Sequence, residues 1–258
     1  MAKERLYRTE GLVLRRTDFG EADRLLTVFT PDLGKLRLIA KGARKTKSRK
    51  AGHIELFTHT ALLVAKGRNL DIISQAESLE SFRPLREDLG RISYAYYVVE
   101  LLDRFIEEGD ENFPLFELAL RTVARLSDEA AENLFLALRY FELHLLGLTG
   151  FQPQLHFCVA CGNPLQPVTN YFQVADGGVL CPKDGEARAH AEPLLVATLK
   201  VLRFLQTEAW PRVKGLQLTP ATGEKVEKTL QRYITYLLER KLKSTDFLKH
   251  LQEQERRS

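Results

Sequence analysis

Three cysteines and one aspartate stand at metal-ligand spacing in the second half of the chain. Two residues separate Cys158 from Cys161, and the same spacing separates Cys181 from Asp184 after nineteen intervening residues. Two knuckles at this separation are typical of a four-ligand structural zinc site, because each tight turn directs two side chains at one ion. The sequence therefore predicts a zinc site made by Cys158, Cys161, Cys181 and Asp184.

The fourth position leaves an alternative open. Structural zinc sites prefer Cys and His, although a carboxylate can bind the ion at about 2.0–2.2 Å. His156 and His190 are the substitute ligands if Asp184 does not serve. The other alternative is a knuckle that folds without metal through packing of Phe172, Val179 and Leu180. A catalytic zinc is not expected, since no His-Glu-x-x-His sequence occurs.

A run of cationic side chains is the second feature with chemical meaning. It occupies sixteen residues that contain no acid, and its members are Lys35, Arg37, Lys41, Arg44, Lys45, Lys47, Arg49 and Lys50. Such a cluster favours binding to a polyanion such as a nucleic acid. Arg15, Arg16 and Arg24 are expected to extend the surface. The alternative is a solvated loop with no partner.

No motif of a common enzyme class accompanies these features. The sequence lacks a phosphate-binding P-loop, a Gly-x-Gly-x-x-Gly turn and a Gly-x-Ser-x-Gly nucleophile elbow. Its six histidines are scattered, and no carboxylate pair stands out as an acid–base couple. We therefore expect a binding protein without catalytic residues or a nucleotide cofactor.

Composition agrees with an ordinary globular protein of one or two domains. The chain has 258 residues, a net charge of +4, 44% hydrophobic residues and 28% charged residues. No apolar run approaches the ~18 residues of a membrane span, and the N-terminus lacks the pattern of a secretory signal. An odd number of cysteines favours a reducing compartment. The expected location is the cytoplasm.

The first eighty residues read as short strands joined by turns. Lys35 to Leu38 alternates basic and apolar residues, which is the period of a strand with one buried face. Four more strand candidates are Gly11–Arg16, Arg24–Thr30, Leu56–Ala65 and Leu70–Ser74. Five short strands at close spacing predict a small barrel. The segment Gly42–Gly52 is too basic to be a core strand and is expected to form a mobile loop.

The remainder of the chain shows helical periodicity around one irregular stretch. Helices are expected from about Leu89 to Gly109, over Phe113–Leu126, from Glu129 to about Leu146 with a cap at Ser127–Asp128, over Leu194–Leu205, and after Thr219–Pro220. The fold class is therefore α+β and multidomain. The expected domains are residues 1–80 as a barrel, 81–150 and 191–258 as two parts of a helical domain, and 151–190 as the cysteine insert.

Several strings resemble the bacterial RecO family of recombination mediators. They are Gly11–Arg16, Phe19–Leu25, Gly34–Arg37 continuing to Lys41–Lys45, and Gly150–Pro153 leading to Cys158. Asp184 departs from the family, many members of which carry a fourth cysteine there. The order of barrel, helices and cysteine insert also resembles that of the family over nearly the whole chain.

The resemblance implies an N-terminal OB-fold, a helical domain and a zinc-ribbon-like insert. It also implies a non-enzymatic protein of the nucleoid that binds single- and double-stranded DNA and anneals complementary strands. With RecR, such a protein loads RecA onto DNA coated by single-stranded DNA-binding protein, whose acidic tail it recognises through the helical domain. No motif places that tail on particular residues.

The expected mechanism is electrostatic. If about five cations contact a single strand, the logarithm of the affinity falls with the logarithm of salt concentration at a slope near −3.5. Phe19 is a candidate for base stacking, although burial is the simpler expectation for an aromatic side chain. The basic residues Arg240, Lys241 and Lys243 are a possible extension of the DNA path.

Two other functions stay open from the sequence. One is an RNA-binding OB-fold and zinc-ribbon protein. The other is a nuclease, which the absence of a carboxylate cluster disfavours. Residues 81–150 are acidic overall, and their positive charges are all Arg. These could receive a carboxylate from a partner, but pairing within helices, as between Glu117 and Arg121, is the simpler interpretation.

Overall fold

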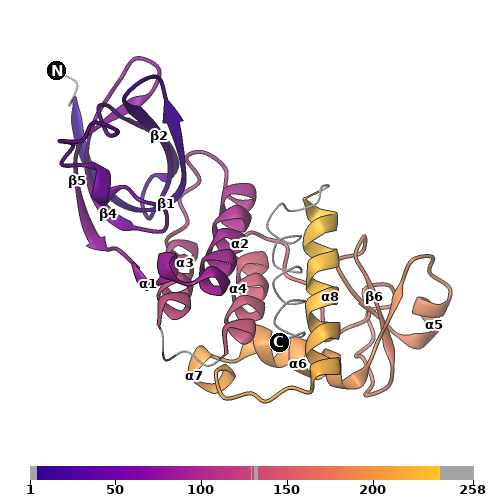
Figure 1. Cartoon of the computed structure of the whole chain (residues 1–258). Helices are drawn as coiled ribbons and strands as arrows, with labels where there is room; N and C mark the ends of the chain where they lie inside the picture. Colours follow the sequence, from indigo (N-terminus) through magenta and orange to yellow (C-terminus); the bar gives the residue numbers. More distant parts are fainter. Residues whose placement is uncertain (1–4, 129, 131–132, 239–258) are drawn as a thin grey trace. The chain divides into compact units, whose positions relative to one another are not determined.

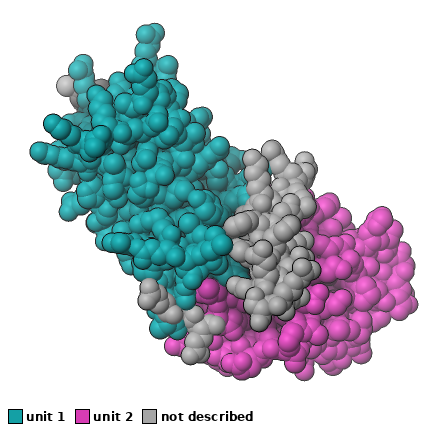
Figure 2. All heavy atoms as spheres, in the orientation of Figure 1, with its two compact units in different colours: residues 1–131, 244–258 teal, residues 132–243 magenta. Residues whose placement is uncertain are grey.

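The computed structural model describes residues 5–128, 130 and 133–238. The chain divides into two compact units, one of residues 1–131 with 244–258 and one of residues 132–243 (Figure 2). The basic residues Arg240, Lys241 and Lys243, which the sequence suggested as part of a DNA path, lie outside the described residues.

The first unit begins with a closed five-stranded barrel (Figure 1). Its strands are β1 (Leu6–Phe19), β2 (Asp23–Thr30), β3 (Gly34–Ala40), β4 (His59–Ala65) and β5 (Asp71–Glu80). The order around the barrel is β1-β2-β3-β5-β4, with β4 paired back to β1. All pairs are antiparallel except β3 with β5. This closed five-strand arrangement is that of an OB-fold.

Alternation along the strands fills the barrel. Val13, Val28, Leu38 and Val64 are among the fully buried residues of its core, and every second residue of a strand points to the other face. Arg37 is exposed on that other face, and so is Arg15, because a bulge between Val13 and Arg15 shifts the register of β1. The alternation of Lys35 to Leu38 thus predicted β3 correctly.

Helices cover part of the outer surface of the barrel. They are α1 (Pro84–Glu87), α2 (Leu89–Phe105) and α3 (Phe113–Ser127). Phe29 of β2 packs edge-on against Phe116 of α3, with ring centroids 5.6 Å apart. Gly34 has φ +63°, and a Cβ atom there would lie 2.5 Å from the backbone of Asp110. Only glycine therefore allows β3 and the segment after α2 to approach so closely.

The second unit combines helices with the cysteine insert. Its helices are α4 (Leu134–Leu148), α5 (Pro182–Glu186), α6 (Val196–Thr207), α7 (Trp210–Val213) and α8 (Pro220–Leu237). Strands β6 (Asn170–Gln173), β7 (Gly178–Leu180) and β8 (Glu192–Leu194) form a sheet in the order β7-β6-β8. The ring of Phe172 on β6 packs against that of Tyr233 on α8, which attaches the insert to the helices.

A buried ion pair joins α4 to α8. The side chain of Arg139 is 1% exposed, and its guanidinium lies 2.8 Å from the carboxylate of Glu142 and 3.4 Å from that of Glu227. Removing one partner of such a pair leaves a buried charge uncompensated, which is strongly destabilising. The contact with Glu227 is the one that links α4 to α8.

The structure corrects the expected start of the third long helix. Asp128 ends α3, and α4 begins at Leu134, where the side chain of Asn133 accepts a hydrogen bond from the amide of Leu136. Asn is as good an N-cap as Asp, so Asn133 can begin the helix in place of the expected Ser127–Asp128. The cap at Thr219 with Pro220 in the first turn is confirmed for α8.

The basic segment Gly42–Gly52 is a loop, as expected, but it is anchored at several points. The amide of Arg44 donates to the carbonyl of Ala22, the side chain of Ala43 is buried, and residues Ala51–His53 form a single 3-10 turn. Contacts along the loop therefore hold its position on the barrel. No helix in the described part of the chain is long and apolar enough to cross a membrane.

Candidate nucleic-acid interface and metal centre

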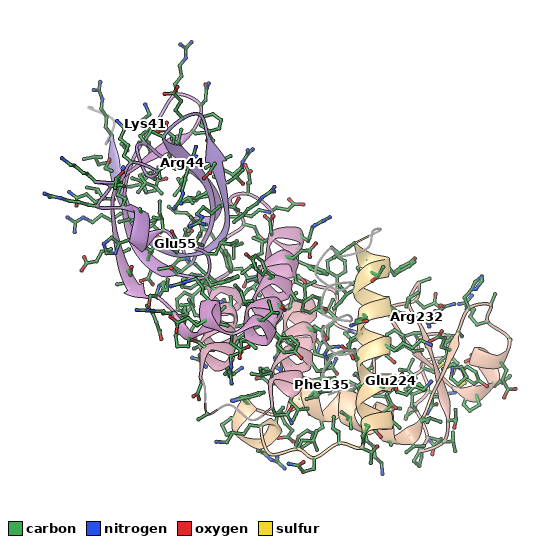
Figure 3. The ribbon with its side chains drawn as sticks, viewed as in Figure 1. Lys41, Arg44, Glu55, Phe135, Glu224 and Arg232 are labelled. Atoms are coloured by element: carbon green, nitrogen blue, oxygen red, sulfur yellow. The ribbon has the colours of Figure 1, made fainter. Side chains whose placement is uncertain are left out.

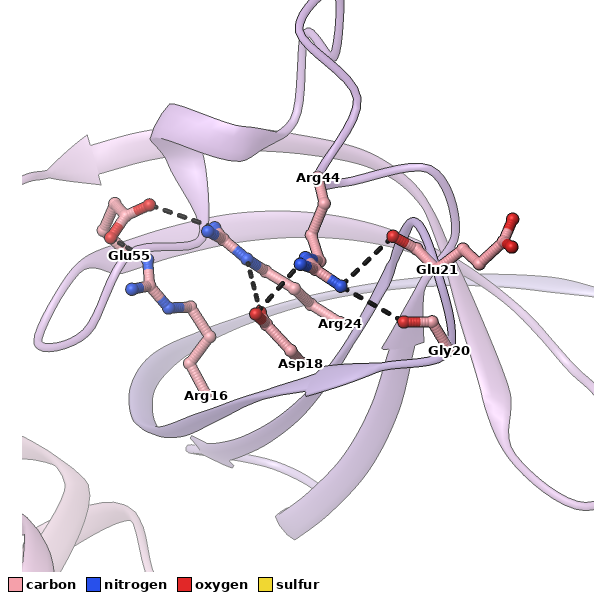
Figure 4. Close-up of polar contacts among 7 residues, drawn as sticks. All are labelled: Arg16, Asp18, Gly20, Glu21, Arg24, Arg44 and Glu55. Atoms are coloured by element: carbon pink, nitrogen blue, oxygen red, sulfur yellow. Dashed lines mark hydrogen bonds and ion pairs between the residues drawn. The ribbon is translucent and has the colours of Figure 1, made fainter.

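Three of the predicted DNA-binding arginines form a network with two carboxylates at one end of the barrel (Figure 4). Glu55 accepts from Arg16 and from Arg24, the latter at 3.1 Å. Asp18 lies 3.6 Å from Nε of Arg24 and 3.2 Å from Nε of Arg44. Two anions thus offset most of the charge of these three arginines.

Arg44 also fixes the turn between β1 and β2. Its guanidinium donates to the carbonyl oxygens of Gly20 and Glu21, each at 3.1 Å (Figure 4). Because this side chain joins the basic loop to the β1–β2 turn, its first role is to position the loop.

Two lysines of the run are also engaged. The ammonium of Lys35 lies 2.6 Å from the carbonyl oxygen of Asp103 in α2 and 3.2 Å from its carboxylate. Lys50 donates to the carbonyl of Ile73 at 2.9 Å, and burial lowers its pKa from the ordinary value. Both lysines therefore tie the basic run to neighbouring elements.

The other six predicted cations are exposed and have no ion pair with any residue that the structure describes. They are Arg15, Arg37, Lys41, Lys45, Lys47 and Arg49. Figure 3 shows Lys41 on the barrel beside the anchored Arg44. The basic run is thus divided between cations that hold the fold and cations that face solvent.

Arg15 and Arg37 belong to one row across three strands. Arg15 of β1 is paired with Thr27 of β2, and Thr27 is paired with Arg37 of β3. The side chains of directly opposed residues lie on the same face of a sheet, about 5 Å apart at Cβ. The two guanidinium groups therefore rise from the same outer face of the barrel.

A pocket of about 280 Å³ opens on this face. Its cationic lining residues are Arg15, Arg37 and Lys35, and Thr17, Leu25 and Thr27 line it from the strands. Its acidic lining residues are Asp103 and Glu108, from the end of α2 and the segment after it. The sequence analysis did not identify these two acids, because nothing in the local pattern brings them to β3.

Phe19 differs from the simpler expectation. Its side chain is 50% exposed at the end of β1, so the expectation of burial was wrong. Phe19 is paired with Asp23, whose carboxylate accepts from the amide of Gly42 in the basic loop. An exposed aromatic ring on a surface that also carries cations is the combination that binds single strands by stacking.

The predicted metal ligands come together in the insert. The ligand atoms of Cys158, Cys161, Cys181 and Asp184 all lie within 4.8 Å of one another. In a tetrahedral zinc site with bonds near 2.3 Å, sulfur atoms are about 3.8 Å apart, so the cluster has the right size and donor set. Neither His156 nor His190 belongs to this cluster.

Local turns explain the geometry of the cluster. Gly162 donates its amide to the carbonyl of Cys158, and Gly185 donates to that of Cys181. A Cβ atom on Gly185 would lie 2.4 Å from the ring of Tyr171, so the second knuckle packs directly on β6. Val179 and Leu180 are fully buried beneath it.

Thiol groups surround the carboxylate of Asp184. The thiols of Cys158 and Cys181 lie 3.2 Å from Oδ2, and hydrogen bonds from Cys158, Cys161 and Cys181 hold the pKa of Asp184 below its ordinary value. A carboxylate that stays ionised among three sulfur atoms is a suitable fourth ligand, and zinc would supply structural crosslinking there rather than chemistry.

The barrel, the helices and the cysteine insert define an α+β protein built on an OB-fold. Comparison with known families and proteins agrees. Residues 1–82 match the model for the recombination protein O N-terminal domain, and residues 86–246 match that for the C-terminal domain. The chain therefore belongs to the RecO family of DNA repair and recombination proteins.

Individual relatives match over most of their length. The DNA repair protein RecO of Roseiflexus sp. is 47% identical over 95% of this chain and 86% of its own. RecO of Desulforudis audaxviator is 38% identical over 95% of this chain and 97% of its own length. RecO of Dehalococcoides mccartyi is 34% identical over 97% of this chain and 98% of its own length. The family assignment thus applies to the barrel and to the helices.

Proposed function

We propose that this protein is a recombination mediator that binds DNA through the outer face of its barrel and the adjacent basic loop. The six exposed cations without an ion pair to a described residue are the observation that carries this proposal. They lie on β1, on β3 and in the loop that follows β3, so they can neutralise phosphates along one strand. Phe19 provides a surface for base stacking.

Annealing of complementary strands follows from the same surface. Two DNA strands repel each other, and a concentrated positive surface lowers that repulsion without making or breaking a bond. We infer that the protein acts by binding alone. In the repair role of the family, RecR, the tail of single-stranded DNA-binding protein and, indirectly, RecA would be its partners. Zinc, held by Cys158, Cys161, Cys181 and Asp184, would stabilise the insert.

The test is neutralisation of exposed cations that hold no structural contact. We would replace Lys41, Lys45, Lys47 and Arg49 together by Ala and titrate single-stranded DNA at several salt concentrations. Six contacts predict a slope near −4 for the wild type, and the variant should fall to about −1.5. Arg44 and Lys50 are left intact, because their contacts hold the loop.

The control removes the same charge from other exposed positions, with Lys66, Arg68, Lys200 and Lys214 replaced by Ala. This variant should keep most of the wild-type slope. Equal slopes for the two variants would overturn the proposed surface. Competition with tRNA distinguishes the alternative, since an RNA-binding protein would release single-stranded DNA at low tRNA concentration. Annealing and RecA loading are then measured with purified RecR and single-stranded DNA-binding protein.

A further inference from the structure

The pocket on the outer face of the barrel carries charges of both signs, which phosphate binding alone does not explain. Arg15 and Arg37 line it together with Asp103 and Glu108. A carboxylate beside a phosphate-binding cation repels the phosphate. Asp103 is accounted for by its contact with Lys35, but no structural contact among the described residues accounts for the carboxylate of Glu108.

Backbone contacts hold Glu108 at the pocket. Glu108 and Lys35 form a parallel bridge between the segment after α2 and β3, and Lys35 itself is bound to Asp103. Glu108 is exposed, and it has no ion pair with any residue in the described ranges. The backbone of Glu108 is therefore held beside β3, and its carboxylate is an acceptor without a partner among those residues.

The pocket has the size of one nucleoside. Its volume of about 280 Å³ is near the lower end of small-molecule sites, and Thr17, Thr27 and Leu25 offer hydroxyl groups and an apolar surface. A carboxylate accepts hydrogen bonds from the amino group of a base such as cytosine. Thymine and uracil present a carbonyl oxygen at the same place, which a carboxylate repels.

We propose that this pocket is a base subsite of the DNA-binding surface. Arg15 and Arg37 hold backbone phosphate at its mouth, and Glu108, next to Asp103, accepts a hydrogen bond from the amino group of the inserted base. Bases with an amino group at this edge are favoured over thymine. This inference rests on the proposed function, because the strand must first bind to the barrel.

The experiment compares oligo(dC) with oligo(dU) of equal length, since the two bases differ at the edge that the carboxylate would contact. The wild type should bind oligo(dC) at least about fivefold more tightly, the lower limit for one good base contact. Glu108→Gln and Glu108→Ala should reduce the difference to less than about twofold. Glu107→Gln is the matched control and should keep the preference, because Glu107 is exposed but does not line the pocket.

The outcomes separate the two proposals. Binding of both oligonucleotides with the expected salt slope but with equal affinity would overturn the base subsite and leave the DNA-binding surface standing. A preference that survives unchanged in both Glu108 variants would also overturn it. Failure to bind either oligonucleotide would overturn both proposals. Urea unfolding of each variant establishes that the exposed substitutions leave the fold intact.

Discussion

Lys35 of β3 is bound to Asp103 of α2, 68 positions away in the sequence. Its ammonium lies 2.6 Å from the carbonyl oxygen and 3.2 Å from the carboxylate, and its side chain is 13% exposed. The residue that begins the basic run therefore joins the barrel to the helix beside it.

Replacing Lys35 with Met should lower the free energy of unfolding by about 1–2 kcal/mol, because two hydrogen bonds to a charged group are lost at a partly exposed site. Urea unfolding measures the effect. The control Lys47→Met, at an exposed position, should change stability by less than about 0.5 kcal/mol but weaken DNA binding more. Equal stability of the two variants would contradict the structural role of Lys35.

Glu55→Gln should increase the salt dependence of DNA binding. Glu55 offsets the charge of Arg16 and Arg24, so its neutralisation makes both available to phosphate and steepens the slope by up to about 1.4. The free energy of unfolding should fall by about 1 kcal/mol. Glu77→Gln removes the same charge from an exposed site on β5 and should leave the slope unchanged. A slope unaffected by Glu55→Gln would mean that the two arginines do not reach DNA.

Gly34→Ala should destabilise the first unit by about 3 kcal/mol, because it combines a left-handed backbone with a clash against Asp110. Gly20→Ala is the matched control. Gly20 has φ +58° but nothing within 4 Å of the added methyl, so the cost should be about 1 kcal/mol. Thermal unfolding of both variants measures the difference. Similar costs would show that the close approach to Asp110 is unimportant.

Asp184→Ala should weaken zinc binding, and Asp184→Cys should restore it, since a fourth thiolate completes a familiar donor set. The purified protein is expected to hold about one zinc ion per chain. Metal content and competition with a chromogenic chelator measure retention, and Co²⁺ substitution reports sulfur ligands by absorption. Equal retention by the wild type and Asp184→Ala would exclude Asp184 as a ligand.

His59 should make stability depend on pH. Burial lowers the pKa of His59, although Glu10 and Glu80 oppose this effect. The folded state therefore holds the proton less tightly than the unfolded state. The contribution of neutral His59 to the free energy of unfolding is fully present above the unfolded pKa of about 6.5. It is lost as the pH falls below that value.

The measurement for His59 is the free energy of unfolding between about pH 7 and pH 5. His59→Gln should flatten the decline. His190→Gln, at an exposed position, should retain the wild-type decline. Parallel curves for His59→Gln and the wild type would contradict a lowered pKa.

Local sequence patterns were sufficient to predict much of the architecture. The alternation of Lys35 to Leu38 predicted β3, Thr219 and Pro220 marked the start of α8, and the spacing of the cysteines predicted the cluster with Asp184. The period of a strand or helix and the spacing of ligands in a turn depend on the backbone geometry of a few consecutive residues. They can therefore be predicted without knowledge of distant contacts.

The tertiary structure decided which cations are available to a ligand. Arg16, Arg24 and Arg44 meet Asp18 and Glu55 only when the barrel closes. In the same way, Glu108 reaches the pocket only when the segment after α2 pairs with β3. The sequence by itself determined where positive charge is concentrated. Folding determined how much of it remains unpaired, because opposite charges far apart along the chain become neighbours only in three dimensions.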